Sequence, residues 1–536
     1  MWIVFEYASL GSESQATGIM AKGIVAAGHE LTVRAAEIIL NEGGNAFDAI
    51  LAAHLAACVT EPVLASLGGG GFMLARPCNS EPVLYDFFVQ TPRVKRPAEE
   101  CDFHPILADF GTAQQEFHIG QGTIATPGSV KGIFRIYREL GSIPLTTIAA
   151  PAIEYARDGV KVNGVQAYIF SIVSPIYMAT PETREIYGNG GSSDDVVEEG
   201  KTIRQPKLAE TFERLAVEGE DLFYHGEICR EIVQHCRDEG GHLTQEDLEG
   251  YKVVRRQPLD VDFNGSHVRT NPPPSSGGIL IAFALELLKE AKPARDEFGS
   301  YRYLRLLAEV LTQTNLARVD ALSRQNGHED LESHLLNAEY LRRYREEVAS
   351  RAKAFRGTTQ MSVIDASGNV ASMTISNGEG CGSIVPNTGI MLNNMLGEQD
   401  LNPEGFHLWP EDCRMTSMMA PTLLQRADGA VVATGSGGSN RIRTALLQVV
   451  MNLAHFELDV TDAVLSPRIH LESEKLSVEG GFSAEEVERL VADFPEHEVW
   501  DDRNLFFGGA HTVMVQGGEF SGVGDPRRGG VCRVVE

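Results

Sequence analysis

The sequence predicts a layered α+β fold, because helical and strand-like patterns are concentrated in different parts of the chain. Helical periodicity with charged faces dominates from about Phe134 to Arg351. Short β-type runs separated by turn residues dominate after Gly357. Helices and strands that are segregated in this way usually pack as separate layers. At 536 residues the chain is also long enough to bury a substantial core.

The N-terminal part of the chain supplies the first expected elements. Apolar residues recur at helical spacing over His29–Cys58, and the glycine-containing run Asn41–Asn45 divides this segment into two helices. The glycine run Gly68–Gly71 then leads into a strand at Phe72–Ala75, and Val83–Phe88 is a further expected strand.

The later elements are predicted from the same patterns. Pro272–Gly278 precedes an apolar helix at Ile279–Leu288, and the charged segment Arg342–Arg356 is expected to be an exposed, mobile connector. We then predict five strands, one helix and a final hairpin: Thr359–Asp365, Val370–Ser376, Ile390–Asn393, Thr422–Gln425 and Val431–Thr434, helix Arg443–Phe456, and hairpin strands His511–Val515 and Glu519–Val523.

Composition and charge argue against several classes of protein. Apolar residues make up 43% and charged residues 22% of the chain, as in ordinary soluble globular proteins. The formal net charge of −28 and the absence of a long basic run give little support for nucleic-acid binding. No segment reaches the roughly 18 uninterrupted apolar residues of a membrane span. We therefore expect neither nucleic acid nor a membrane as a partner.

The cysteines and the first residues favour a cytoplasmic protein. The eight cysteines are scattered, without a CxxC motif or a Cys/His cluster, so free thiols and no metal site are expected. Met1–Leu10 lacks a basic n-region, its apolar run is broken by Glu6, and no clear small-residue cleavage site follows. Residues 1–19 are expected to be a loose extension.

The most informative segment is a predicted hairpin after Gly357. Its two strands flank the turn residues Ala366–Asn369. A turn centred on Ser367 places Thr358 opposite Ser376, and the alternative register places it opposite Asn377. Either register brings a polar side chain to about 5 Å from Thr358.

Thr358 can act as a nucleophile only if a base lies close to its hydroxyl group, and no Ser-His-Asp arrangement is evident. The α-amine of an N-terminal threonine can supply that base, since its ordinary pKa of about 7.7–8.0 is close to neutrality. This chemistry requires cleavage between Gly357 and Thr358, and glycine tolerates the strained backbone of an acyl shift. By itself, however, a Thr-Thr pair at the start of a strand usually reflects only the preference of threonine for β-strands.

A second segment, Val432–Arg441, runs from a strand through glycines into a helix. Such a junction presents backbone N–H groups at a helix N-terminus, which suits an oxyanion hole. A tight turn needed only for packing explains the glycines equally well. A phosphate-binding loop is not indicated, because the GxxxxGK[ST] pattern is absent.

At these residues the chain resembles the gamma-glutamyltranspeptidase family from about Met20 to the C-terminus. The resemblance rests on the order and spacing of several motifs: Asn41–Asp48, Glu61-Pro62, Gly68–Leu74, Thr126–Gly132, Pro273–Gly278, Thr358–Asp365, Gly435–Arg441, Ser466–His470 and Gly524–Arg527.

The resemblance implies a four-layer αββα N-terminal-nucleophile hydrolase that is made as a precursor. It implies a large subunit, residues 20–357, and a small subunit, residues 358–536, which form one interwoven domain. It places the nucleophile at Thr358, its hydroxyl partner at Ser376, and the oxyanion-hole groups at Gly438 and Ser439. The implied reaction transfers a gamma-glutamyl group from a glutathione-like amide to water or an amine, without a metal or organic cofactor. The expected partners are a small amide substrate and the two subunits of one precursor, and a homo-oligomer of such heterodimers is among the expected assemblies.

The chain departs from the family pattern where the acyl donor would bind. Phe88 stands where family members carry an arginine for the donor α-carboxylate, and a phenyl ring cannot replace a guanidinium. A serine pair becomes Ser417-Met418 and a glutamine becomes Met395. An asparagine beside the nucleophile becomes Gly378, with Asn377 displaced by one position, whereas Glu398 remains suited to the donor amino group. The arginines considered as replacements are Arg441, Arg414 and Arg93.

These departures leave three hypotheses. The first is an acyl-transfer enzyme for gamma-glutamyl amides. The second is an amidohydrolase of the same fold for a less polar acyl group, and the third is a catalytically silent relative. The last is disfavoured by the joint presence of Thr358, Ser376 and the glycine loop.

Overall fold

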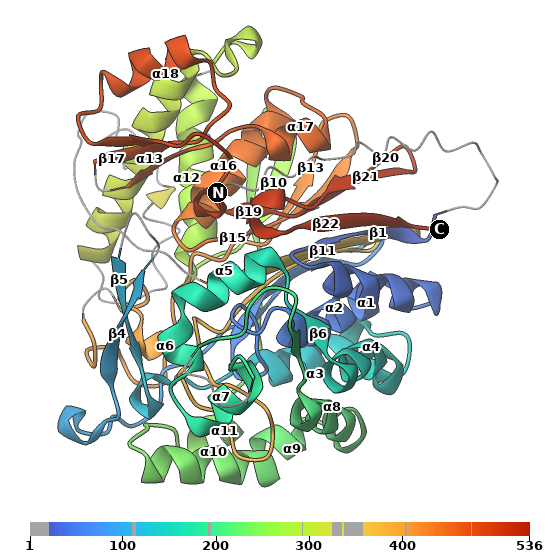
Figure 1. Cartoon of the computed structure of the whole chain (residues 1–536). Coiled ribbons are helices and arrows are strands. Elements are labelled where there is room, and N and C mark those ends of the chain that lie inside the picture. The colour runs from blue at the N-terminus through green and yellow to red at the C-terminus, as the bar shows by residue number, and fades with distance from the viewer. Residues whose placement is uncertain are drawn as a thin grey trace.

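The computed structural model describes residues 21–109, 114–190, 195–291, 293–323, 335–336, 357–402, 405–472 and 474–536. The predicted extension 1–19 and the predicted connector Arg342–Arg356 lie outside these residues. Two β-sheets pack face to face, with helices on both outer faces (Figure 1). The predicted α+β, four-layer αββα fold is therefore confirmed.

The first sheet is antiparallel and has the strand order β22-β1-β11-β12-β2-β3-β8. Within it, β1 from before Gly357 lies between β22 and β11 from after Gly357, so the two parts of the chain share one sheet. The strands are β1 Gly23–Ala27, β2 Gly70–Arg76, β3 Val83–Phe87, β8 Val254–Arg256, β11 Thr359–Asp365, β12 Val370–Ser376 and β22 Val531–Val535.

The second sheet has the order β21-β20-β14-β13-β10-β9 and faces β1, β11 and β12 of the first. Its strands are β9 Leu259–Phe263, β10 Ser266–Thr270, β13 Thr422–Gln425, β14 Val431–Thr434, β20 Thr512–Gln516 and β21 Glu519–Val523. The β9–β10 hairpin lies in the region predicted to be dominantly helical. Asn264 and Gly265 form its turn with φ of 55° and 75°, which is the turn that the dipeptide Asn-Gly favours.

Helices α1 and α2 cover the outer face of the first sheet beside the hairpin of β11 and β12, which we call the nucleophile hairpin after the role predicted for Thr358. Every residue of α2 is buried, because it packs between the sheet and its neighbours α1 and α4. The helices on this side are α1 Glu30–Asn41, α2 Ala46–Thr60, α3 Ser129–Leu140, α4 Leu145–Asp158, α5 Gly164–Ile172, α6 Ser174–Tyr177, α7 Pro181–Tyr187, α8 Pro206–Glu218, α9 Asp221–Tyr224, α10 Glu227–Asp238 and α11 Gln245–Gly250.

Helices α12, α16 and α17 pack on the second sheet or on each other, and α13 and α18 lie outside them (Figure 1). Their bounds are α12 Ser276–Ala291, α13 Tyr301–Ser323, α16 Arg441–Ala454, α17 Val460–Leu465 and α18 Ala484–Val491. The smaller strands are β4 His104–Asp109, β5 Gln114–Ile119, β6 Val160–Lys161, β7 Thr202–Ile203, β15 Ser436–Gly437, β16 Ile469–Glu472, β17 Lys475–Val478, β18 His497–Val499 and β19 Gly509–Ala510.

Most strands predicted after Gly357 have the predicted bounds, and the predicted helix Arg443–Phe456 is α16. The strand predicted at Ile390–Asn393 is wrong. This segment forms only isolated bridges, from Met391 to Ile384 and from Leu392 to Gly68. Its backbone is held by single hydrogen bonds rather than by a ladder: the Cys381 N–H donates to the Leu392 carbonyl at 2.9 Å, and Ser66 Oγ donates to the Met391 carbonyl at 2.6 Å.

Polar side chains on β11 and β12 fix the nucleophile hairpin against the second sheet. Gln360 Nε2 donates to Ser372 Oγ at 3.0 Å, which joins the two strands. Ser372 Oγ donates in turn to the Thr434 carbonyl at 2.7 Å, and Ser362 Oγ donates to the His511 carbonyl at 2.9 Å. Because buried polar groups are costly unless they are hydrogen-bonded, these bonds specify one position for the strand that begins beside Thr358.

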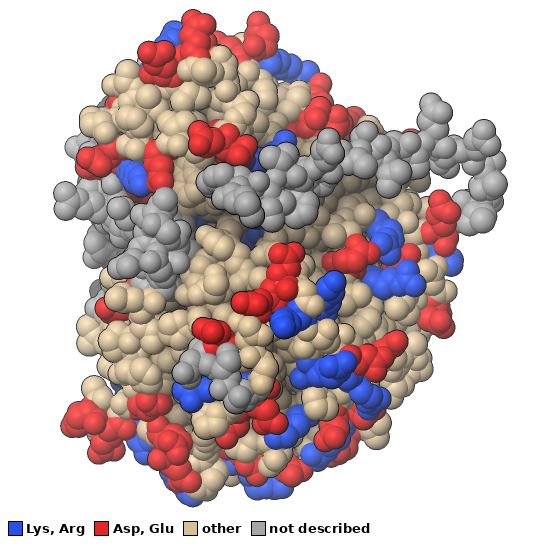
Figure 2. Space-filling model, in the orientation of Figure 1, with Lys and Arg blue, Asp and Glu red and all other residues tan. Residues whose placement is uncertain are grey.

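On the face drawn in Figure 2, acidic side chains are spread over both the upper and lower parts of the molecule, in keeping with the net charge of −28. All eight cysteines are free thiols. In the part of the chain that the structure describes, no helix combines the length and apolar character needed to cross a membrane.

A buried ion-pair network anchors the C-terminal segment. Asp525 Oδ2 lies 2.7 Å from Arg468 Nη2, and Asp525 Oδ1 lies 3.2 Å from Arg527 Nη1. Arg527 also pairs with Glu479 at 2.6 Å. Burial acts to raise the pKa of Asp525, but Arg468 and Arg527 outweigh it and the pKa is lowered to about 2. The Asp525 side chain therefore stays ionised in the folded protein.

Asp525→Asn is expected to lower the free energy of unfolding by about 3–5 kcal/mol, because it leaves buried guanidinium charge uncompensated. The wild-type contribution is complete above the ordinary aspartate pKa of 3.8 and is lost as the pH falls through about 2. Urea unfolding at neutral pH measures the difference. The control Asp428→Asn removes an exposed partner of Arg426 and should change stability by less than about 1 kcal/mol. Equal effects of the two substitutions would contradict the role given to the network.

Candidate active site

The nucleophile hairpin adopts the first of its two predicted registers. Thr359 pairs with Ile375 and Ile364 pairs with Val370 across β11 and β12. Continuing this register places Thr358 opposite Ser376 rather than opposite Asn377. Both side chains are largely buried, with 5% of Thr358 and 8% of Ser376 exposed.

The peptide bond between Gly357 and Thr358 is held by side chains from the end of β12. Ser376 Oγ donates to the Gly357 carbonyl at 2.8 Å and accepts from the Gly378 N–H at 3.0 Å. The Gly357 N–H donates to Glu379 Oε1 at 3.1 Å. The carbonyl carbon of Gly357 is thereby fixed and polarised beside the threonine that follows it.

Gly378 is a glycine for a steric reason. Its φ is +65°, and a Cβ atom there would lie 2.2 Å from Asn394 Oδ1 and 2.3 Å from Glu398 Oε1. The space that a side chain at this position would need is therefore filled by Asn394 and Glu398. This accounts for the absence of the asparagine that the family resemblance implies at position 378.

The glycine loop between β14 and α16 lies against the backbone of Thr358. A Cβ atom on Gly437 would lie 2.2 Å from the Thr358 carbonyl oxygen, so only glycine allows this approach. Gly438 and Ser439 have φ of +125° and +53°. Within the described residues, the N–H groups of Gly438 and Ser439 donate to no acceptor. Free N–H groups at the start of a 14-residue helix are suited to hold an oxyanion.

Thr358 and Ser376 open into a pocket that has both apolar and acidic walls. Phe88, Met395 and Met418 contribute apolar surface, and Glu398 and Asp400 contribute carboxyl groups. Among the residues that the structure describes, the lining consists of Phe88, Ser276, Thr358, Ser376, Met395, Glu398, Asp400, Leu401, Thr416, Ser417, Met418, Met419, Ser439 and Ile442. This set, which we call the acyl pocket, contains no lysine or arginine.

The structure brings together most of the residues selected from the sequence. Thr358, Ser376, Ser439, Phe88, Glu398, Ser417 and Met418 all line the acyl pocket. Gly438 precedes Ser439 in the glycine loop. Asn377 is the exception, because it is fully buried outside the pocket lining, and its amide atoms have no hydrogen-bond partner in the described part of the chain.

None of the three arginines considered as replacements lines the acyl pocket. Arg414 is held by Asp86 at 3.4 Å and donates to the Lys252 carbonyl at 2.6 Å. Arg93 pairs with Asp412 at 3.5 Å, and the Arg441 guanidinium lies 4.3 Å from the centre of the Phe506 ring.

Several pocket residues were not selected from the sequence. Ser276 belongs to the family motif Pro273–Gly278, but no role was assigned to it from the sequence. Glu379 lies outside the pocket lining but accepts a hydrogen bond from the Gly357 N–H, and it was not selected either. Asp400 and Leu401 come from an irregular segment without a recognisable motif, and only the fold brings them to the pocket.

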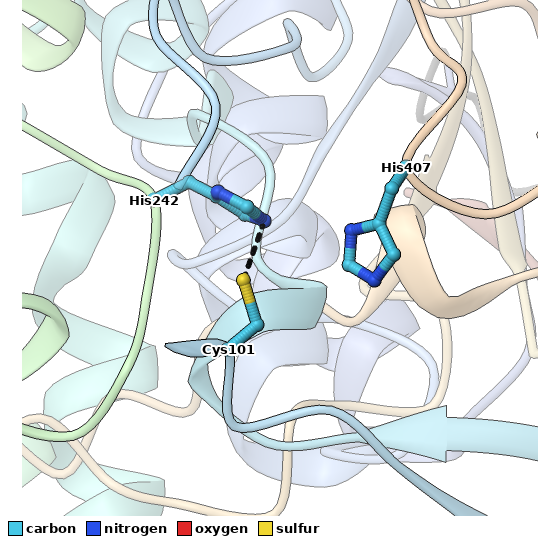
Figure 3. A group of neighbouring side chains, drawn as sticks. All are labelled: Cys101, His242 and His407. Carbon is cyan, nitrogen blue, oxygen red and sulfur yellow. Dashed lines mark hydrogen bonds between the residues drawn. The ribbon is translucent and has the colours of Figure 1, made fainter. Parts of the chain in front are cut away.

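A Cys/His cluster, which the sequence did not predict, lies outside the acyl pocket. Cys101, His242 and His407 bring potential ligand atoms to within 4.8 Å of one another (Figure 3). His242 Nδ1 accepts a hydrogen bond from the Arg96 N–H at 3.0 Å, so the neutral ring carries its proton on Nε2. This Nε2 lies 3.6 Å from Cys101 Sγ and presents a proton to it. A metal-binding histidine needs the opposite tautomer, so the cluster is poorly suited to hold a metal ion.

Comparison with known proteins decides the family. The Gamma-glutamyltranspeptidase sequence profile matches residues 32–535. The chain belongs to this family. One family relative is the "Glutathione hydrolase proenzyme" of Escherichia coli (strain K12), which is 31% identical over 540 residues, covering 94% of this chain and 90% of the relative. The family resemblance inferred from the motifs is confirmed.

Two further family relatives carry acylase names. The "Acylase ACY 1 proenzyme" of Pseudomonas sp. (strain V22) is 28% identical, over 89% of this chain and 87% of its own. The crystal structure of cephalosporin acylase from Bacillus halodurans has a TM-score of 0.81 with 25% identity, and the match covers 100% of both chains. The protein is therefore an enzyme of the gamma-glutamyltranspeptidase family with the N-terminal-nucleophile hydrolase fold.

Proposed function

We propose that the protein cuts its own chain between Gly357 and Thr358 and then cleaves amides through an acyl group carried on Thr358 Oγ. The observation that carries this proposal is the hydrogen bond from Ser376 Oγ to the Gly357 carbonyl, beside Thr358. The cut would yield residues 1–357 and 358–536, whose strands remain interleaved in the first sheet. Assembly of several such heterodimers stays a prediction.

The maturation step follows from this arrangement. Thr358 Oγ attacks the carbonyl carbon of Gly357 while Ser376 donates to the developing oxyanion and Glu379 holds the Gly357 N–H. The C–N bond breaks, its nitrogen takes the hydroxyl proton, and an ester joins Gly357 to Thr358 Oγ. Water then hydrolyses the ester, which leaves a carboxylate on Gly357 and a free α-amine on Thr358.

Turnover uses the freed amine as the base. The amine accepts the proton from Thr358 Oγ as the oxygen attacks the substrate carbonyl, and the N–H groups of Gly438 and Ser439 stabilise the oxyanion. The proton passes to the departing amine as the amide bond breaks. Water or a second amine then attacks the acyl-enzyme, which gives hydrolysis or transfer.

Two classes of acyl donor are proposed. Gamma-glutamyl amides such as glutathione are supported by family membership and by Glu398, which can hold the donor amino group. Acyl groups without an α-carboxylate are supported by the described lining of the acyl pocket, in which there are two carboxyl groups and apolar side chains but no cation. A buried carboxylate without a cationic partner would be costly, so the lining favours the second class.

Four p-nitroanilides separate these donors: gamma-glutamyl, 4-aminobutyryl, glutaryl and butyryl. Relative to the first, the second lacks the α-carboxylate, the third lacks the amine, and the fourth lacks both. We expect kcat/KM for 4-aminobutyryl to equal or exceed that for gamma-glutamyl, and glutaryl to be the poorest substrate because its carboxylate faces Glu398 and Asp400. A tenfold or greater preference for gamma-glutamyl over 4-aminobutyryl would instead establish a carboxylate-binding site.

Glu398→Gln is the matched control for this series. It should lower kcat/KM for the amine-bearing substrates by about tenfold to a hundredfold, the usual effect of losing one charge-assisted hydrogen bond. It should leave butyryl cleavage nearly unchanged. A uniform loss over all four substrates would show that Glu398 supports the fold rather than the substrate amine.

The compartment is proposed on different grounds. All eight cysteines are free thiols, which supports a reducing environment such as the cytoplasm.

A further inference from the structure

A second pocket lies beside α5 and the start of α1 and shares no lining residue with the acyl pocket. We call it the α5 pocket. Most of its wall is apolar and comes from Val63, Leu64, Val165, Ile169, Phe170 and Leu505. Its polar lining includes His29, Glu61 and Arg528, and the arrangement of these three side chains indicates what the pocket can bind.

Arg528 is a cation for which no described residue provides a partner. Its guanidinium makes no ion pair or hydrogen bond with any described residue, and its Nε atom is buried. Burial, together with the nearby charge of Arg441, lowers the pKa of Arg528 to about 10, so it remains protonated at neutral pH. Arg528 as a whole is partly exposed, but its buried Nε–H group has no acceptor among the described residues, and a carboxylate can accept two N–H groups of a guanidinium at once.

His29 offers a second unused donor to the same pocket. Only 6% of the residue is exposed, and its Nδ1 accepts from the Leu31 N–H at 3.1 Å, which caps α1. The neutral ring therefore carries its proton on Nε2, and this N–H has no acceptor among the residues that the structure describes. Burial lowers the pKa of His29 to about 4, so the ring is neutral at physiological pH.

The acid in the pocket does not neutralise these donors. Glu61 Oε2 accepts from Thr359 Oγ1 at 2.7 Å, and Glu61 Oε1 accepts from Thr32 Oγ1 at 3.0 Å. Burial raises the pKa of Glu61 to about 7, so it is only partly ionised at neutral pH. Both of its oxygens are thus engaged with hydroxyl groups, and it forms no ion pair with Arg528 in the described structure.

We propose that the α5 pocket binds a small carboxylate that bears an apolar group. Arg528 and the His29 Nε2–H hold the carboxylate, and the apolar wall covers the attached group. This site is separate from the acyl pocket, whose lining among the described residues has two acids and no cation. It goes beyond the proposed amide cleavage, and its test does not depend on turnover.

Binding of phenylacetate to the purified full-length protein, measured by isothermal titration calorimetry, tests the proposal. Two matched probes separate the two parts of the site, since phenylacetamide lacks the charge and acetate lacks the apolar group. We expect both to bind at least tenfold more weakly than phenylacetate. Equal binding of phenylacetate and phenylacetamide, or no binding of phenylacetate at millimolar concentration, would overturn the proposal.

Variants then locate the binding site. Arg528→Gln should weaken phenylacetate binding by tenfold to a hundredfold, and His29→Asn should weaken it less while keeping the cap of α1. The control Arg269→Gln removes a guanidinium that pairs with Asp260 on the second sheet, and it should bind as the wild type does.

Val165→Trp on α5 tests the apolar wall independently of the charge. It should abolish phenylacetate binding by filling the pocket, while circular dichroism and the melting temperature report that the fold is intact. Binding is measured rather than turnover, because the Arg528 guanidinium also lies beside Gly438 of the proposed oxyanion hole. A Cβ atom added to Gly438 would be 3.2 Å from Arg528 Nη2. Wild-type affinity in both Arg528→Gln and Val165→Trp would place the ligand elsewhere and refute the proposed site.

Discussion

Thr358→Ala is expected to yield one continuous chain of 536 residues, whereas the wild type yields fragments 1–357 and 358–536. Alanine lacks the oxygen that attacks the Gly357 carbonyl, so neither the ester nor the free α-amine can form. Amide cleavage should fall to background in the same preparation. Denaturing electrophoresis and p-nitroanilide hydrolysis measure the two effects.

Thr358→Ser is the matched control, because it keeps the hydroxyl group and removes only a methyl group. It should still cut its chain and retain measurable turnover. Cleavage of the alanine variant at the wild-type rate would show that another group performs the cut.

Ser376→Ala is expected to slow self-cleavage by about a hundredfold to a thousandfold, the usual effect of removing one oxyanion donor. Ser376 is the side chain that donates to the Gly357 carbonyl. The rate is measured as loss of the continuous chain after purification at low temperature. Ser376→Thr keeps the hydroxyl group and should restore most of the rate.

Ser372→Ala separates this effect from a general weakening of β12. Ser372 lies on the same strand and is fully buried, but its Oγ donates to Thr434 rather than to the scissile bond. It should slow cleavage by less than about tenfold. Comparable losses in Ser372→Ala and Ser376→Ala would indicate that both act through the fold.

The sequence predicted the nucleophile hairpin well because its information is local. Alternating residues define both strands, the turn at Ala366–Asn369 limits the register to two choices, and the structure adopts the one that pairs Thr358 with Ser376. The glycine loop was predicted for a similar reason. Only glycine at position 437 allows the close approach to the Thr358 carbonyl.

The lining of the acyl pocket was harder to predict, because it depends on contacts between distant segments. Phe88, Glu398 and Met418 were found through family motifs rather than through any local pattern. Asp400 of the acyl pocket and Arg528 of the α5 pocket have no sequence signal, since the pocket that each residue lines exists only in the folded chain. The β9–β10 hairpin was missed although Asn264-Gly265 is a turn signal, because its helical surroundings dominated the interpretation.

The N-terminal sequence of the smaller fragment, read from purified active protein, tests the central claim most directly. The proposed mechanism requires a free α-amine on Thr358, so the first residues should read Thr-Thr-Gln-Met. An active protein whose chain is continuous at Gly357–Thr358, or whose smaller fragment begins at another residue, would contradict it.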